Sequence, residues 1–178
     1  MSGFRLAAPK IRWLPIILGI SGLHAHAQTC LVLSQATIAT DGTASMELSL
    51  NSSSVESPAA LQWTFRYPTS SISSLIVDGG PMLTSAGKTT ICGGDAAAYK
   101  CLAVGANTKT IANGVIAKVI AVLAPGASRA TMRISDTLGT SAMGYLIPVS
   151  SRIEPVTGAY VSDDCRLRPP PGGRSGSR

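Results

Sequence analysis

The stretch that decides the fold is "ALQWTFRY", residues 60–67. Apolar side chains occupy every second position of it, and polar side chains occupy the positions between. Successive side chains of a β-strand point to opposite faces, so this alternation predicts a half-buried strand with its rings in a core. The apolar row is Leu61, Trp63, Phe65 and Tyr67, and the polar row is Gln62, Thr64 and Arg66.

Segments of the same kind continue on both sides and predict an all-β domain. In "ASMELSLN" (44–51), methionine and leucine alternate with serine and glutamate, and an Asn-Gly turn at 113–114 precedes the long apolar segment "VIAKVIAVLA" (115–124). Helix signals are weak throughout. Short segments with a turn about every 8–12 residues are typical of a β-sandwich or barrel. The expected strands are 30–39, 44–51, 60–67, 72–78, 88–92, 99–104, 115–124, 130–139, 145–149 and 152–156.

The first residues have the order of parts found in a secretory signal peptide. Basic residues precede an apolar run at 13–23, and an Ala25-x-Ala27 motif follows it. This order predicts a signal peptide over 1–27, cleaved between Ala27 and Gln28. The alternative, an uncleaved membrane anchor, would need a longer apolar run. We therefore expect a secreted protein, extracellular or periplasmic, with no membrane span after cleavage.

The two ends also account for the net charge of +6. The last residues, "RLRPPPGGRSGSR" (166–178), predict a disordered Pro/Gly/Arg-rich tail. The single domain between the ends, 28–165, holds eight basic residues against nine acidic ones. A basic face for nucleic acid is therefore not expected.

All four cysteines follow the predicted signal peptide, and in an exported chain an even number predicts disulfides. Three pairings are possible. A bond between the neighbours Cys92 and Cys101 would close a short loop and stabilise the fold by about 2.5–3 kcal/mol in the chain-entropy model. The remaining Cys30 and Cys165 lie at the two ends of the domain and would form the second pair.

Catalytic and metal-binding patterns are missing from the predicted mature sequence. Both histidines, His24 and His26, lie in the predicted signal peptide, which excludes a Ser-His-Asp triad or a histidine-bound metal after cleavage. The acidic residues are scattered, and Asp163 and Asp164, the one adjacent pair, lie beside the tail. We expect a non-catalytic domain without a metal or cofactor.

Three stretches together resemble the bacterial cohesin domain family: "GTASMELSLN" (42–51), "AALQWTFRYPTSSISSLIVDGG" (59–80) and "YKCLAVGANTKTIANGVIAKVIAVLA" (99–124). The resemblance covers about residues 30–157. It implies a nine-stranded jelly-roll β-sandwich, shared with carbohydrate-binding modules, that binds dockerin modules through one flat sheet face. The pair Cys92/Cys101 is similar to the loop staple of a cohesin-like subgroup found outside cellulosomes. Thr69 stands where the family usually has Asp or Asn.

The resemblance also implies where a partner would bind. In segment 115–124 the family's inward positions begin at Val115 and take every second residue, so the alternate row should face outward. Cohesins place this strand beside the strand at 60–67, which would join the two outward rows into one surface with an apolar centre at Ile120 and Val122 and a polar and basic surround. We expect a charge at Ile120 to abolish partner capture while leaving the fold intact. In the alternative, the loop closed by Cys92 and Cys101 covers this strand. The predicted face is Gln62, Thr64, Arg66, Lys118, Ile120 and Val122.

Three functions fit these patterns. The first is a binding or scaffold module for a dockerin-like protein, in a polysaccharide-degrading or surface assembly. The second is a carbohydrate-binding module, which would require Trp63, Phe65 and Tyr67 to be an exposed platform for polysaccharide. The third is a surface subunit that associates with itself through the same face. The exposure of Trp63 and Ile120 should separate these functions.

Overall fold

The computed structural model describes residues 29–53 and 56–154. The predicted signal peptide with its Ala27–Gln28 cleavage site, the predicted tail at 166–178 and Cys165 lie outside the described residues. Within the described ranges, no helix has the length and apolar character needed to cross a membrane.

The described chain is built almost entirely of strands, as the alternating patterns predict. The strand expected at 145–149 and the first residues of the one expected at 152–156 belong to one continuous strand, β10, and residues 155–156 lie outside the described residues. The strands are β1 (Thr29–Leu33), β2 (Thr37–Ile38), β3 (Thr43–Asn51), β4 (Ala60–Arg66), β5 (Ile72–Gly79), β6 (Thr89–Gly93), β7 (Tyr99–Val104), β8 (Gly114–Leu123), β9 (Arg133–Thr140) and β10 (Leu146–Ile153).

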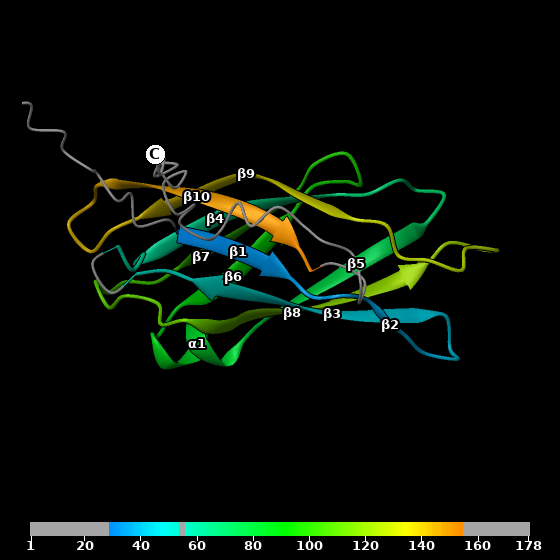
Figure 1. The fold of residues 1–178 in the computed structure, drawn as a ribbon, viewed down its shortest axis with the longest axis horizontal. Helices are drawn as coiled ribbons and strands as arrows, with labels where there is room; N and C mark the ends of the chain where they lie inside the picture. The colour runs from blue at the N-terminus through cyan, green and yellow to red at the C-terminus, as the bar shows by residue number, and fades with distance from the viewer. Residues whose placement is uncertain (1–28, 54–55, 155–178) are drawn as a thin grey trace, which may run out of the picture.

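Nine of these strands follow one another in the order β5-β8-β3-β1-β10-β9-β4-β7-β6, and the two-residue β2 pairs with β3 beside this path. The path folds into two layers that share β10 (Figure 1). Residues Val149–Ile153 of β10 pair in parallel with β1, and Leu146–Pro148 pair antiparallel with β9. The predicted nine-stranded jelly-roll sandwich is confirmed.

The core between the layers is made by the apolar rows of the strands. Leu61, Trp63 and Phe65 on β4 are buried, and the rings of Trp63 and Phe65 meet edge to face with centroids 6.5 Å apart. Tyr67 is half-buried and packs against the margin of this core. These rings therefore belong to the core and do not form an exposed platform.

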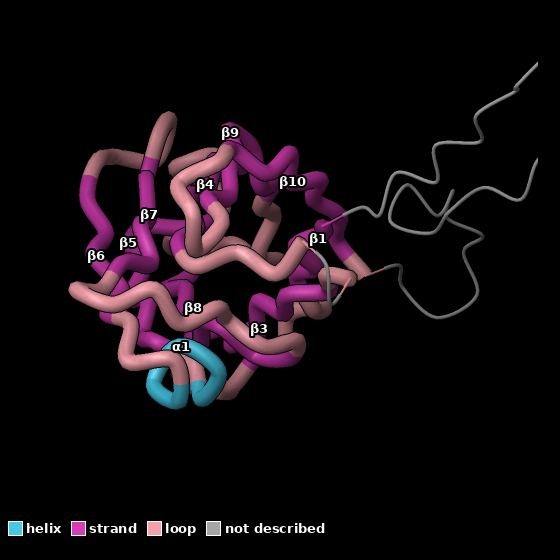
Figure 2. Tube along the Cα trace, turned by 90° about the vertical axis from the view of Figure 1, so that its left-hand side faces the viewer, coloured by secondary structure: helices cyan, strands magenta, loops and turns pink. Residues whose placement is uncertain are grey.

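One helix, α1 (Pro81–Ser85), was not expected from the sequence. It has Pro81 in its first turn and lies against β8 at one end of the sandwich (Figure 2). Gly80 is the N-cap residue that precedes this helix. The backbone N–H of Gly80 donates to the carbonyl of Ile116 at 2.8 Å. Proline is favoured in the first turn of a helix, so the sequence "GGP" (79–81) could have indicated that a helix begins there.

The predicted local disulfide is confirmed. Cys92 on β6 and Cys101 on β7 are direct cross-strand partners, and their sulfurs are bonded at 2.03 Å. Residues 92–101, which we call the stapled loop, thus connect two neighbouring strands of one layer. Cys30 is buried on β1, and the described residues contain no free cysteine. The pairing of Cys30 with Cys165 stays a prediction.

Candidate functional site

The structure divides the predicted six-residue face into two halves. Strand β4 pairs with β7 and β9, whereas β8 pairs with β3 and β5 in the other layer. Their outward side chains consequently lie on opposite sides of the sandwich, and the expectation that they form one surface is wrong. Alternation identifies which side of a strand faces the core, but it does not identify the strand's neighbours.

The alternative that the stapled loop covers β8 is also wrong. The loop connects β6 and β7, which belong to the layer containing β4. On β8, Lys118 and Ile120 are exposed and Val122 is half-buried. On β4, Gln62 and Arg66 are half-buried, whereas Thr64 is fully buried although it belongs to the outward row.

We define the β4 face as the outward side of β9, β4, β7 and β6 together with the start of β10. Strand register places one residue of each strand in a continuous row across this face. Gln62 lies in the middle, and the other four members of the row are apolar. The row runs Pro148, Leu138, Gln62, Leu102 and Ile91.

Three of the four apolar side chains of this row are exposed to solvent, and the fourth, Leu102, is half-buried. Ile91 is 57% exposed and Leu138 is 38% exposed, and at the β9–β10 hairpin Tyr145 and Leu146 are also exposed. A contiguous apolar patch on a flat sheet is typical of a surface that binds another molecule. The sequence analysis did not select these residues. Leu102 could have been selected from the sequence, because it follows Cys101. The disulfide of Cys101 faces the core, so the next side chain along the strand points outward.

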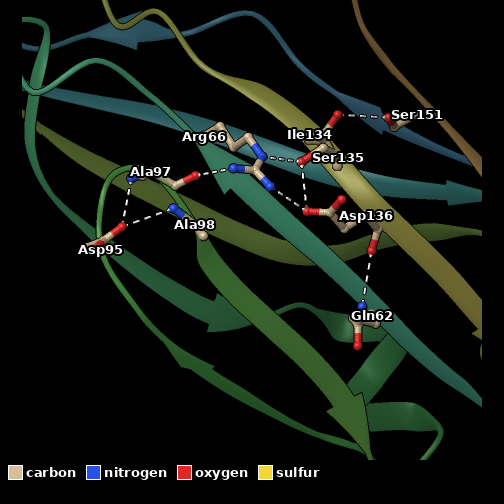
Figure 3. Close-up of polar contacts among 9 residues, drawn as sticks. All are labelled: Gln62, Arg66, Asp95, Ala97, Ala98, Ile134, Ser135, Asp136 and Ser151. Atoms are coloured by element: carbon tan, nitrogen blue, oxygen red, sulfur yellow. Dashed lines mark hydrogen bonds and ion pairs between the residues drawn. The ribbon is translucent and has the colours of Figure 1, made fainter.

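Charged and polar groups gather at one end of the β4 face, around Arg66 (Figure 3). The guanidinium donates from Nε to the hydroxyl of Ser135 at 2.8 Å and from Nη2 to the carboxylate of Asp136 at 2.9 Å. Its Nη1 donates to the carbonyl of Ala97 in the stapled loop. One side chain therefore connects β4, β9 and the stapled loop.

A β-bulge in β9 makes this arrangement possible. The register with β4 shifts between Gln62 and Thr64, and Asp136 adopts a left-handed conformation with φ of 50°. Aspartate tolerates that conformation better than most residues. The bulge leaves the Asp136 carbonyl free to accept a hydrogen bond from the Gln62 amide at 3.3 Å and turns its carboxylate toward Arg66.

Two properties of this end concern Thr64 and Asp136. Ser135 is the β9 partner of Thr64, and a hydrogen bond from the Thr64 hydroxyl is among the contacts that lower the pKa of Asp136, so the buried Thr64 lies beside this cluster. The hydrogen bond from Arg66 also holds the pKa of Asp136 below its ordinary value, so this carboxylate is ionised at neutral pH. The Arg66–Asp136 pair therefore carries no net charge toward a partner.

The opposite side of the sandwich, which we call the β8 face, has a different pattern. Lys118 lies between Glu47 of β3 and Asp78 of β5, and the next row places Ile120 beside Ile76. Ile120 is 36% exposed. On the β8 face, the pair of Ile120 and Ile76 is thus bordered by a row of three charged side chains. On the β4 face, the row that crosses five strands has four apolar members and Gln62.

Among the described residues, no cluster of three or more His, Cys, Asp or Glu side chains could hold a metal ion. Glu47 and Asp78 lie on either side of Lys118, and Asp136 is bonded to Arg66.

No protein-family sequence profile matches this chain, and no curated protein has significant sequence similarity to it. In fold, a type I cohesin of Clostridium thermocellum solved with a dockerin matches with a TM-score of 0.59, covering 71% of this chain and 98% of that one at 6% identity. The sixth cohesin of scaffoldin B from Acetivibrio cellulolyticus, solved with a Cel5 dockerin mutant, matches at 0.57, covering 71% and 99% at 16% identity.

A non-cellulosomal cohesin from the archaeon Archaeoglobus fulgidus matches with a TM-score of 0.55, covering 71% of this chain and 87% of that one at 11% identity. The predicted resemblance to cohesins is therefore confirmed at the level of the fold. Similarity at such low identity establishes a shared fold and leaves the partner to be argued from the surface itself.

Proposed function

We propose that this chain is an exported, non-catalytic binding module that recognises a dockerin-like protein partner through its β4 face. The proposed setting is a polysaccharide-degrading or surface assembly. The predicted signal peptide supports export. The cohesin fold and the presence of dockerins in two of the similar structures support a protein partner.

The observation that carries the proposal is the row across five strands in which four apolar residues, three of them exposed, flank the half-buried Gln62. A partner that covers Ile91, Leu102 and Leu138 removes aliphatic surface from water, which contributes roughly 25 cal/mol per Å². Gln62 and the Arg66 cluster would supply hydrogen bonds beside this apolar centre, an arrangement common in protein interfaces.

A carbohydrate-binding function has less support. Stacking on sugars uses exposed rings, and Trp63 and Phe65 are fully buried. Among the described residues, Tyr145 at the β9–β10 hairpin is the ring with large exposure. Polysaccharide retention is therefore included in the test as a competing outcome.

The two faces provide a matched pair of substitutions. Leu138 on the β4 face and Ile120 on the β8 face are mid-strand aliphatic residues with nearly equal exposure, 38% and 36%. Leu138→Asp and Ile120→Asp therefore introduce the same charge at similar cost to the fold. Binding of each variant to a panel of purified dockerin modules would be measured by biolayer interferometry.

We expect Leu138→Asp to weaken binding at least about tenfold, because a buried unpaired carboxylate costs more than 1.4 kcal/mol. Ile120→Asp should bind like the unaltered protein. Thermal unfolding of both variants checks that the fold is retained. The proposal fails if Ile120→Asp is the variant that loses binding, or if the protein is retained on insoluble cellulose and binds no dockerin. Self-association that Leu138→Asp abolishes would assign the β4 face to a second copy instead.

A further inference from the structure

A cavity of about 430 Å³ opens at the Arg66 end of the β4 face. Its apolar walls are Tyr67 and Pro68, which follow β4, and Met132, which precedes β9. The stapled loop contributes Ala96 and Ala97 to the lining. The cavity thus lies where three segments far apart in the sequence meet.

The wall made by the stapled loop is held in place by hydrogen bonds. The N–H of Tyr67 donates to the Ala96 carbonyl at 3.1 Å, and Arg66 donates to the Ala97 carbonyl. Asp95 accepts from the N–H groups of Ala97 and Ala98 at 2.9 and 3.1 Å (Figure 3). With the Cys92–Cys101 bond, these contacts make the cavity a preformed site.

Two arginines line the cavity, and they differ in their partners. Arg66 is bonded to Asp136, Ser135 and Ala97. Arg133, its cross-strand partner on β9, is exposed and forms no ion pair with any described residue. The carboxylate of Asp95, the other acidic group nearby, accepts the two loop N–H groups. The cavity therefore has a free guanidinium beside apolar walls.

We propose that this cavity receives a glutamate or aspartate side chain of the bound partner. The carboxylate pairs with Arg133, whose planar guanidinium can donate two parallel hydrogen bonds to it. The methylene groups of the acidic side chain then pack on Tyr67, Pro68 and Met132. This inference rests on the proposed function, since the cavity opens at the end of the β4 face, and it assigns to the partner an acidic residue beside its apolar contact surface.

The test titrates the full chain, expressed for export and labelled with ¹⁵N, with acetyl-Ala-Glu-Ala-amide. Acetyl-Ala-Gln-Ala-amide, which has the same shape without the charge, is the matched ligand. We expect the Glu peptide to bind about two- to fivefold more tightly than the Gln peptide, because Arg133 is exposed and water weakens its ion pair with a carboxylate. The shifted signals should be the amides of Tyr67 and Ala97 and the Nε–H of Arg133.

Arg133→Ala should reduce binding of the Glu peptide to the level of the Gln peptide. Lys109→Ala removes one positive charge from an exposed loop near the start of β4, at the other end of the strand, and should leave binding unchanged. Equal affinity for the two peptides, or an effect of Lys109→Ala equal to that of Arg133→Ala, overturns the inference. Because no dockerin is present in this titration, its failure leaves the binding result for Leu138→Asp to be judged separately.

Discussion

Removal of the Cys92–Cys101 bond tests how the β6–β7 pair and the stapled loop are stabilised. The informative change is the double substitution Cys92→Ala and Cys101→Ala. Cys101 is fully buried, so alanine is preferable to serine, whose hydroxyl would need a hydrogen-bond partner in the core. A variant is also preferable to a reductant, because the chain has four cysteines and a reductant would act on all of them.

The magnitude follows from the sequence separation of nine residues. Closing a loop of that size restricts the unfolded chain by about 2.5–3 kcal/mol in the chain-entropy model. The variant should lose that amount of unfolding free energy. For a domain of this size the loss corresponds to a fall in melting temperature of roughly 8–14 °C.

Urea unfolding followed by the fluorescence of Trp63 measures the effect directly, because this fully buried ring becomes hydrated when the two layers separate. The slope of the transition should also increase slightly, since the unfolded chain without the bond exposes more surface. A loss below about 1 kcal/mol would refute the argument and would show that the unfolded chain is already compact around this loop.

Two further predictions concern the backbone and the Arg66 cluster. Gly80→Ala should destabilise the fold by about 1–3 kcal/mol in urea unfolding, because its Cβ would lie 2.5 Å from the Val115 carbonyl oxygen, whereas Gly93→Ala meets nothing within 4 Å and serves as the control. Asp136→Asn should lower stability at pH 7, and the difference from the unaltered protein should shrink as the pH is lowered below 3.8. The folded-state pKa of Asp136 lies below the ordinary 3.8, so its contribution is present above that pH and is lost as the pH falls through the folded value. A difference that stays constant through the whole acid titration would mean that the Arg66 contact does not depend on charge.

Much of the local structure could be predicted from residues alone. The alternation around Trp63 identified both the strand and its buried side, because the period of side chains along a strand is fixed by the backbone. The nine-residue spacing of Cys92 and Cys101 and the glycines between them indicated a local disulfide. The resemblance to cohesins identified the nine-stranded sandwich, which the structure confirms.

The candidate site could be predicted only in part, and the errors share one cause. Gln62 was correctly placed on an outward row, but its neighbours Leu102 and Leu138 come from segments 40 and 76 residues later. No local pattern records which strands lie side by side. The burial of Thr64 has the same origin, because the residues beside it, Ser135 and Asp136, come from β9.

The sequence by itself determined the all-β character, the inward rows of β3 and β4 and the local disulfide, since these depend on residues close together in the chain. Only the tertiary structure decided that β4 and β8 lie on opposite sides and that a bulge at Asp136 orders the Arg66 cluster. It also decided that Arg133 is left free beside a cavity. Those features depend on the pairing of distant strands, which is selected by the free energy of the whole sandwich and not by any one segment.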